Sequence, residues 1–326
     1  MGRFLNVGII QMPVDNDTVV NLKYIEEKTA ELMSAYHKPE LVVGVECIES
    51  FTPQYIPGGS ITKFFSQIAK KHGIYFIPGS MYEKHDDLPE GRFYNSAPIF
   101  NPKGELIDVY SKMAPWRPAE ENAEPGKKYV VFDIPEKQTK VGVQICYDLN
   151  FPEISRNETL MGAEVLVKLT LDPQELYGLN KPVHFVRALE NQAYLVSTNC
   201  VGFFNGTHLY GNSLVINPEG QLIWEAGQTE SICTVTLDLD LVTRSRQYGT
   251  LFLDHYLQHL RDYNFPMPYA DDVTKAPLFQ TLRRTPCTVD EYEADVQPKG
   301  VCTIGRRNEV SIDLEQYEKN LKDFLG

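Results

Sequence analysis

The sequence has 326 residues, enough for one large α/β domain or two domains of ordinary size, with ample apolar material for a core. Its 31 basic and 44 acidic residues give a formal net charge of −13 without a long block of one sign. This balance argues against a nucleic-acid footprint or an anionic membrane surface as a partner. No stretch approaches the roughly 18 consecutive apolar residues that predict a membrane-spanning helix.

The amino terminus and the cysteines predict a cytoplasmic protein. The segment MGRFLNVGIIQMP enters a strand-like run directly and lacks the longer apolar core of a signal peptide. Asn6 stands where a myristoylation signal needs Ser or Thr. Six scattered cysteines without a C-x-x-C pair suggest neither a disulfide framework nor a zinc module: Cys47, Cys146, Cys200, Cys233, Cys287 and Cys302.

Short β-rich runs alternate with helical patterns over roughly the first 240 residues, which is typical of α/β or layered α+β folds. Most of these runs are continuous and apolar, as expected for strands that are covered on both faces. The predicted strands are 5–11, 41–46, 74–79, 94–100, 141–146, 164–169, 194–199 and 212–217.

The helical patterns carry start and stop signals. The clearest helix can be capped by Ser60 and ended by Gly73. Pro152 and Pro182 each stand where a first-turn proline would open a helix. Helices are therefore predicted over 21–36, 60–72, 152–161 and 182–192.

The sequence changes character from about residue 245. The segment LFLDHYLQHLRDY looks helical, and residues 264–311 are rich in proline with few periodic runs. The last segment places an apolar stripe on one helical face that needs something to bury it: Leu314, Tyr317, Leu321 and Phe324. We predict a domain at 1–245 and an extension at 246–326 that wraps its own domain or a partner subunit.

Cys146 ends the apolar run VGVQIC, and a helix start follows within a few residues. This is where α/β folds place nucleophiles, because the strand end opens onto a crevice and helix-end amides stabilise negative charge. An inert thiol is the alternative, since free cysteine is among the most buried residue types. A reactive thiol also needs a base or a cation, and none of the seven histidines lies in a recognisable papain-like context.

Two charged residues offer what Cys146 needs. Glu46 ends the run LVVGVE, and Lys112 lies in VYSKMAPWRPAEENAEPG, whose prolines and tryptophan indicate a stiff loop. A carboxylate can accept the thiol proton, and a cation can hold the thiolate and later the oxyanion. Taken singly, Glu46 can be a strand end that meets solvent and Lys112 a solvated surface lysine.

Together these segments resemble the nitrilase superfamily of carbon-nitrogen hydrolases, whose pattern is a Glu-Lys-Cys triad in this chain order. The match also includes RALENQAYLVSTN and GNSLVINPEG and spans roughly residues 5–245. It implies that Glu46 is the general base, Lys112 stabilises the oxyanion and Cys146 is the nucleophile. It further implies a four-layer α-β-β-α sandwich, no metal or organic cofactor, and a homodimer or higher homo-oligomer packed helix to helix.

The spacing from Lys112 through Trp116 to Glu120 looks like that of the aliphatic amidase and formamidase branch. This resemblance implies that Glu120 orients the amide NH₂ group and that Trp116 walls the pocket. The backbone N–H of Tyr147 would join Lys112 at the oxyanion. A core aromatic and a solvated acidic loop remain the alternatives for Trp116 and Glu120.

Several positions depart from the family pattern and leave the substrate size open. The segment GVE replaces the common FPE, and Cys47 stands where similar amidases have a tyrosine. Asn150 stands where many carbamoylase and nitrilase relatives carry arginine. The segment LTLDPQ departs from the amidase pattern in the region that lines the pocket. Scaffold or interface roles are expected for Asp148, Glu153, Arg156, Arg187 and Glu190.

The predicted reaction is hydrolysis of a small aliphatic amide to a carboxylic acid and ammonia through a thioester on Cys146. One alternative is a nitrilase or an N-carbamoyl amidohydrolase, which would use the same chemistry. The other is a non-catalytic nitrilase-like scaffold, suggested by GVEC and by the tail. The small-molecule amide and a second copy of the chain are the predicted partners.

Overall fold

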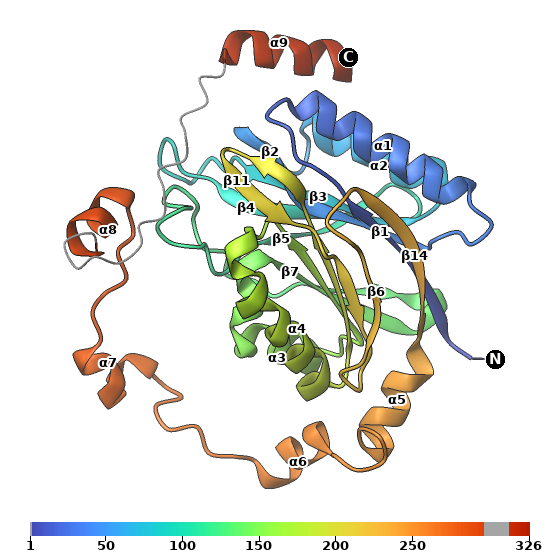
Figure 1. The fold of residues 1–326 in the computed structure, drawn as a ribbon, viewed down its shortest axis with the longest axis vertical. Helices are drawn as coiled ribbons and strands as arrows, with labels where there is room; N and C mark the ends of the chain where they lie inside the picture. Colours follow the sequence, from blue (N-terminus) through green and yellow to red (C-terminus); the bar gives the residue numbers. More distant parts are fainter. Residues whose placement is uncertain (1, 297–312) are drawn as a thin grey trace.

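Two six-stranded sheets lie face to face in the computed structural model, which describes residues 2–296 and 313–326 (Figure 1). The first sheet has the order β14 (Ser231–Asp238), β1 (Phe4–Gln11), β2 (Leu41–Gln54), β3 (Tyr75–Glu83), β4 (Tyr94–Phe100) and β5 (Leu106–Ser111). The second has the order β13 (Leu222–Glu225), β12 (Leu214–Ile216), β9 (Tyr194–Asn199), β8 (Val165–Thr170), β7 (Thr139–Ile145) and β6 (Val131–Ile134). Strands β10 (Val201–Phe204) and β11 (Thr207–Tyr210) form a separate hairpin.

Each sheet is built around three parallel strands, β1 to β3 in the first and β7 to β9 in the second. The remaining strands extend the sheets by antiparallel pairing. Within each triplet, the carboxyl ends of the parallel strands therefore lie at the same edge of the sheet. This is the edge where α/β proteins place their ligand-binding sites. Glu46 lies in β2, and Cys146 directly follows β7.

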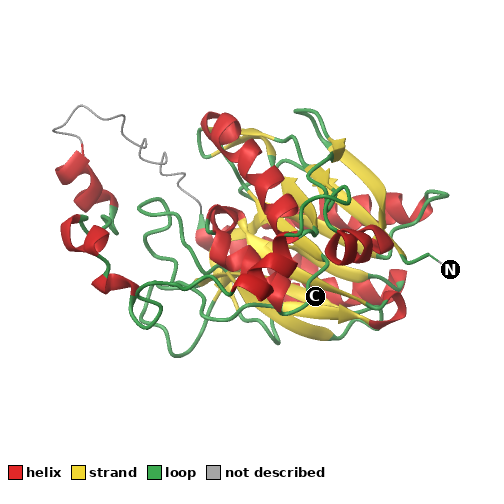
Figure 2. Ribbon diagram, turned by 90° about the horizontal axis from the view of Figure 1, so that it is seen from below, coloured by secondary structure: helices red, strands yellow, loops and turns green. Residues whose placement is uncertain are grey.

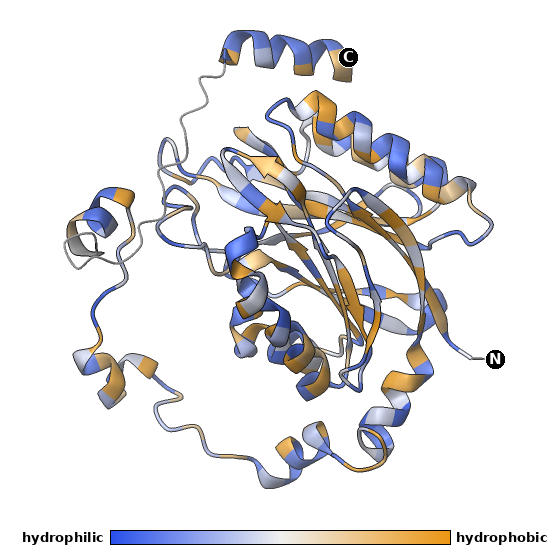
Figure 3. Cartoon of the chain, viewed as in Figure 1, coloured by the Kyte–Doolittle hydropathy of each residue, from blue (hydrophilic) through white to orange (hydrophobic). Residues whose placement is uncertain are grey.

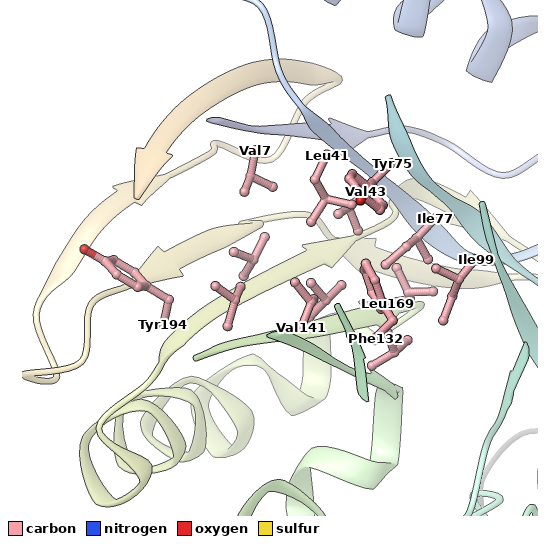
Figure 4. Packing of buried hydrophobic residues seen from close by; sticks show 14 of the residues in the cluster. Val7, Leu41, Val43, Tyr75, Ile77, Ile99, Phe132, Val141, Leu169 and Tyr194 are labelled. Carbon is pink, nitrogen blue, oxygen red and sulfur yellow. The ribbon is translucent and has the colours of Figure 1, made fainter. Parts of the chain in front are cut away.

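Helices cover the outer face of each sheet (Figure 2). The first sheet is covered by α1 (Thr18–Ser34) and α2 (Ser60–His72), and the second by α3 (Pro152–Leu160) and α4 (Tyr177–Asn191). One buried apolar cluster lies between the two sheets, where residues such as Leu41, Ile77 and Val141 meet (Figure 4). A second cluster lies between the first sheet and its helices, and a third lies between the second sheet and its helices. The four-layer α-β-β-α sandwich predicted from the sequence is confirmed.

The hydrophobic pattern explains why the strands were recognisable. Every residue of β3, β8 and β9 is buried, and each strand begins with an apolar run, YFI in β3, VLV in β8 and YLV in β9. Hydrophobic residues, orange in Figure 3, occur in the strands of both sheets. All eight predicted strands are present, and β2 continues beyond its predicted end to Gln54. Six further strands were missed: β5, β6, β10, β11, β13 and β14.

The helices follow the predictions with two corrections. The N-cap of α2 is Gly59 and not Ser60, and Gly73 ends the helix in the left-handed conformation as expected. Helix α4 begins at Tyr177, so the prediction that Pro182 opens it was wrong. The 3-10 turn Gln174–Leu176 leads straight into α4, and Pro182 lies inside the helix, where it removes one backbone hydrogen bond.

The chain leaves the sandwich after α5 (Leu239–Tyr248) and runs outward through α6 (Tyr256–Tyr263), α7 (Pro277–Thr281) and α8 (Val289–Val296) (Figure 1). The helical segment expected at 251–263 begins only at Tyr256, and part of the proline-rich segment 264–311 lies outside the described residues. The division into 1–245 and 246–326 stays a prediction. Among the described helices, none combines the length and the apolar character needed to cross a membrane.

The last helix, α9 (Leu314–Leu325), packs on α1 and α2 of its own chain. Tyr317 and Leu321 are buried, whereas Leu314 of the predicted apolar stripe is 55% exposed. The Tyr317 hydroxyl donates to Oε1 of Glu49 at 2.8 Å, and the ring of Phe324 lies 5.5 Å from that of Phe64. Tyr317, Leu321 and Phe324 of the predicted apolar face thus pack on the first helical layer.

Candidate active site

Cys146 stands at a strained point where a strand becomes a turn. Strand β7 ends at Ile145, and Cys146 opens the 3-10 turn Cys146–Asn150 with a φ of 52°, in the left-handed region that side chains rarely adopt. Such backbone strain occurs mostly at functional sites, because the surrounding structure must hold it in place. The geometry resembles the strand-to-helix elbow that exposes a nucleophile in other α/β hydrolases.

Asp148 holds this turn against the loop that carries Lys112. Its Oδ2 accepts hydrogen bonds from the backbone N–H of Ile145 at 3.0 Å and the hydroxyl of Tyr110 at 2.7 Å. Its Oδ1 accepts from the backbone N–H of Ala114 at 2.8 Å. Burial raises the pKa of Asp148 to about 6. These three hydrogen bonds agree with the structural role that was expected for Asp148.

Glu46 and Lys112 form a buried ion pair whose charges act on Cys146. The regular pairing of β2 with β3 shifts register between Val45 and Glu49, and Cys47 inside this irregularity has a φ of 61°. Lys112 directly follows β5 and is buried, and its Nζ donates to Oε1 of Glu46 at 2.9 Å. A bulge and a strand end therefore bring together two charges that are far apart in the sequence.

Glu120 completes a buried group of two carboxylates around one ammonium. Its Oε2 accepts from Nζ of Lys112 at 2.7 Å and from the backbone N–H of Trp116. Asn95, in β4, bridges the two acids, because its Nδ2 donates to Oε1 of Glu46 at 2.9 Å and to Oε1 of Glu120 at 3.3 Å. Glu120 is buried, so the alternative of a solvated acidic loop is excluded for this residue.

Burial and charge push the two glutamate pKa values apart. Burial raises the pKa of Glu46, and the nearby charge of Lys112 offsets only part of this effect. Burial acts in the same direction on Glu120, but the charge and hydrogen bond of Lys112 outweigh it and hold the pKa of Glu120 below its usual range. A carboxylate with a raised pKa is the better proton acceptor near neutral pH, so Glu46 suits a general base and Glu120 stays ionised.

The cation and the thiol rest in their protonated forms. Burial lowers the pKa of Lys112, but the negative charges that Cys146, Glu120 and Glu46 carry when they are ionised outweigh burial and hold that pKa well above its usual value. Burial, and then the charge of Glu46, raises the pKa of the Cys146 thiol well above its usual range. The thiol therefore has to lose its proton during attack, which requires an adjacent base.

The raised pKa of Glu46 predicts the acid side of a pH–rate profile. As the pH falls through the pKa of Glu46, the base becomes protonated and kcat/KM for an uncharged substrate should fall. We expect the apparent pKa of this acid limb to lie above the value of about 4.3 for an ordinary glutamate. The measurement is initial rate against pH at low substrate concentration.

A neighbouring carboxyl provides the control for this profile. Burial raises the pKa of Glu49 to about 7, although Glu49 contacts the tail through Tyr317 and takes no part in the buried acid group. The Glu49→Gln variant should therefore keep the acid limb where it is in the unmodified protein. An acid limb at or below the ordinary glutamate range would contradict the assignment of Glu46 as base.

The Cys146 thiol opens onto a pocket of about 130 Å³. Trp116, Tyr147 and Asn150 line this pocket together with Leu171 and residues of α4. Trp116 is thus a pocket wall residue, and the role of the Tyr147 backbone N–H at the oxyanion stays a prediction. Cys47 is absent from the described lining residues; it is buried, and its backbone N–H donates to Oγ of Ser80.

Asp172 is the pocket residue that the sequence analysis missed. It lies two residues after β8, and the Cys146 Sγ donates to its Oδ1 at 3.4 Å. Its Oδ2 accepts from Nζ of Lys168, a lysine buried within β8, at 2.9 Å. Both residues lie in KLTLDPQ, so the departure from the family pattern and the lysine inside an apolar strand were signals that could have identified them.

The remaining scaffold predictions have mixed outcomes. Arg187 forms an ion pair with Glu190 at 2.9 Å, and its Nη2 donates to the carbonyl of Asn150 at 3.1 Å. Glu153 lies in the first turn of α3, where an acidic residue suits the helix dipole. Arg156 lies three residues on, but no ion pair between Glu153 and Arg156 is found among the described residues, and the negative charge of Glu190 acts on Arg156 instead.

Comparison with known proteins identifies the family. Residues 6–247 match the model of the carbon-nitrogen hydrolase family. The ω-amidase NIT2-B of Xenopus laevis is 32% identical over 269 residues, which cover 75% of this chain and 91% of that protein. A nitrilase of Pyrococcus abyssi is 35% identical over 196 residues, which cover 59% of this chain and 70% of the relative.

Solved structures agree with this assignment. Nit3 of Saccharomyces cerevisiae, described as a member of branch 10 of the nitrilase superfamily, gives a TM-score of 0.70 at 27% identity and covers 75% of this chain and 94% of its own. An amidase from Nesterenkonia sp. gives a TM-score of 0.65 at 22% identity over 74% of this chain and 94% of its own, a likeness that supports the fold alone. The resemblance stated from the sequence is confirmed, and this chain belongs to the carbon-nitrogen hydrolase family of the nitrilase superfamily, as a hydrolase of carbon-nitrogen bonds.

Proposed function

We propose that the protein is a thiol amidohydrolase that cleaves the C–N bond of a small aliphatic amide to a carboxylic acid and ammonia. The observation that carries the proposal is a buried thiol, Cys146, that lines a small pocket and lies in the electrostatic field of the paired Glu46 and Lys112. The pocket volume of about 130 Å³ lies well below the roughly 300–1,000 Å³ of pockets for drug-sized ligands. A substrate with a short acyl chain therefore fits best.

In the first half of the reaction, the Sγ of Cys146 attacks the amide carbonyl carbon while Glu46 accepts the thiol proton. The oxygen of the tetrahedral intermediate becomes negative, and the ammonium of Lys112 and the backbone N–H of Tyr147 stabilise it. The C–N bond then breaks, and Glu46 returns the proton to the leaving nitrogen. Ammonia departs and the acyl group remains on Cys146 as a thioester.

In the second half, water takes the place of the ammonia. Glu46 accepts a proton from this water, whose oxygen attacks the thioester carbon. The same two donors stabilise the second oxyanion, and collapse releases the carboxylic acid and regenerates the thiol with the proton from Glu46. The reaction consumes one amide and one water, and this chain needs no redox partner for it.

Glu120 supports this chemistry by holding Lys112. Both of its oxygens are engaged by protein donors, namely Lys112, the backbone N–H of Trp116 and the amide of Asn95. We propose Glu120 as a positioning residue for the cation. The orientation of the substrate NH₂ group by Glu120, expected from the family resemblance, stays a prediction.

A panel of substrates tests the proposal. Ammonia release should be measured from formamide, acetamide, propionamide, a glutamine-like amide, a short nitrile and an N-carbamoyl amino acid. Turnover of an amide well above the other classes is the expected result. Turnover of the nitrile or the carbamoyl compound alone would replace the amidase assignment by one of these related reactions, and the nitrilase of Pyrococcus abyssi among the relatives favours the nitrile as the second candidate.

We further propose that copies of the chain associate through the outer helices of the second sheet. Several apolar side chains there face solvent in the single chain: Leu160, Met161, Leu179 and Val186. Exposed apolar side chains on two neighbouring helices are candidates for a protein interface. The outward course of α6 to α8 fits an extension that reaches a second copy, and light scattering of the full chain in solution tests this association (Figure 1).

A further inference from the structure

Asp172 is a charged pocket residue that the proposed mechanism does not use. It is 3% exposed and lies among the residues that line the pocket beside Cys146. Among the described lining residues it is the one with an ionisable carboxyl, and none of them is a lysine or an arginine. Burying a charge costs solvation free energy unless hydrogen bonds or an opposite charge compensate it. The contacts of Asp172 therefore indicate its role.

The two oxygens of Asp172 have different environments. Oδ2 accepts three hydrogen bonds, from Nζ of Lys168 at 2.9 Å, Nδ2 of Asn180 at 3.1 Å and the hydroxyl of Tyr210 at 3.1 Å. Oδ1 accepts one hydrogen bond in the described structure, from the Cys146 thiol at 3.4 Å. The protein therefore fixes one oxygen and directs the other toward the reacting sulfur.

The charge of Asp172 is also fixed. Burial raises the pKa of Asp172, but the charge and hydrogen bond of Lys168 outweigh burial and hold this pKa below its usual range. Lys168 is 1% exposed and does not line the pocket. Its neighbour His184 is neutral, because burial and then the charge of Lys168 lower its pKa to about 3. The ion pair thus presents its negative end to the pocket.

Acylation leaves Oδ1 without its donor. The thiol proton goes to Glu46 during attack, and the Cys146 sulfur then carries the acyl group, so the hydrogen bond to Asp172 is lost. A buried acceptor without a partner is costly, and a donor on the substrate can restore the bond. A carboxylate on the acyl chain would instead face the like charge of Asp172. Lys112, which the mechanism assigns to the carbonyl oxygen, is not among the described residues that line this pocket.

We propose that Asp172 selects amide substrates by the charge of their acyl chain, accepting an ammonium group or another hydrogen-bond donor and rejecting a carboxylate. This inference rests on the proposed function, because it names the substrate class of the same site. It makes Asp172 a specificity-determining residue. The discrimination combines an attractive contact with a repulsive one, as specific sites commonly do.

Ligand binding to the Cys146→Ala variant tests recognition apart from turnover. Removing the sulfur stops the chemistry and leaves Oδ1 without its donor, as acylation does. The probes are butyramide, β-alaninamide, in which an ammonium replaces the terminal methyl, and succinamate, in which a carboxylate replaces it. Near neutral pH we expect the dissociation constant of β-alaninamide, measured by calorimetry or ligand-observed NMR, to be at least about tenfold below that of succinamate.

Changes to the ion pair should change this order. Adding Asp172→Asn leaves the Lys168 charge uncompensated, and the preference should reverse toward succinamate. Adding Asp172→Asn together with Lys168→Met removes both charges, and the difference should shrink to less than about threefold. If the unpaired charge of Lys168 prevents the Asp172→Asn variant from folding, this double change still tests the inference, because it leaves no unpaired charge. Tyr210→Phe is the matched control, because it removes one hydrogen bond to Asp172 without altering charge and should preserve the order.

Two results would overturn the inference: equal binding of succinamate and β-alaninamide to Cys146→Ala, or a difference that survives loss of both charges. Failure of the proposed function gives a different pattern. A protein that binds the probes in the expected order but, with Cys146 present, releases ammonia from no amide would refute the hydrolysis and keep the role of Asp172. Amide turnover without charge discrimination would refute the role of Asp172 alone.

Discussion

The Cys146→Ala variant is expected to lose amide hydrolysis by a factor of at least about 10⁴, since members of a catalytic group act as a unit. Without Sγ there is no nucleophile to form the thioester, and the buried Glu46 and Lys112 have no bond-forming partner. The substitution removes one small atom from a buried position, so the fold should persist. Ammonia release and the unfolding midpoint, measured side by side, separate loss of chemistry from loss of structure.

A second thiol supplies the matched control. Cys233 lies in β14 at the opposite edge of its sheet from β5 and is only partly buried. The Cys233→Ala variant should therefore retain turnover. Acid quenching of the unmodified protein during turnover should reveal an acyl adduct on the peptide that contains Cys146, absent from the alanine variant. Substantial turnover by Cys146→Ala would contradict the thioester mechanism and favour direct attack by water.

Two members of the predicted triad could be recognised from apolar runs, whereas Lys112 was suggested by a stiff loop and by the family resemblance. Glu46 and Cys146 end recognisable hydrophobic runs, and the structure brings Lys112 onto Glu46 at 2.9 Å. The strands were predictable because strands buried on both faces read as continuous apolar runs, whereas the four-layer arrangement was expected from the family resemblance. The missed strands are mostly short or half-exposed: β13, for example, has no fully buried residue, so its pattern resembles that of a loop.

Contacts between segments that are distant in the sequence could not be predicted from the sequence. Asn95 bridges Glu46 and Glu120 from a strand with no unusual composition. Asp172 meets the thiol because β8 pairs beside β7, which no local pattern reveals. Pro182 misled the prediction of α4, because the preceding 3-10 turn continues directly into the helix and the proline is accommodated inside it. In each case tertiary contacts outweighed the local signal.

Replacement of Lys112 by methionine should have the second large effect, on both rate and stability. The variant loses an oxyanion donor, which typically costs about 10²–10³ in rate. It also loses the charge that offsets burial at Glu46, so the pKa of this base should rise further and leave less of it ionised near neutral pH. We therefore expect a loss of kcat of at least about 10³, with the acid limb of the remaining activity moved to higher pH.

The same substitution leaves Glu46 and Glu120 buried side by side without a cation, and breaking a buried ion pair in this way typically costs about 3–5 kcal/mol of unfolding free energy. The double variant Lys112→Met with Glu120→Gln removes one of the two orphaned charges and should recover much of the unfolding free energy. It should not recover turnover, because the oxyanion still lacks its ammonium. If turnover returned together with stability, Lys112 would be a structural counter-ion only, and the oxyanion would depend on backbone donors such as the N–H of Tyr147.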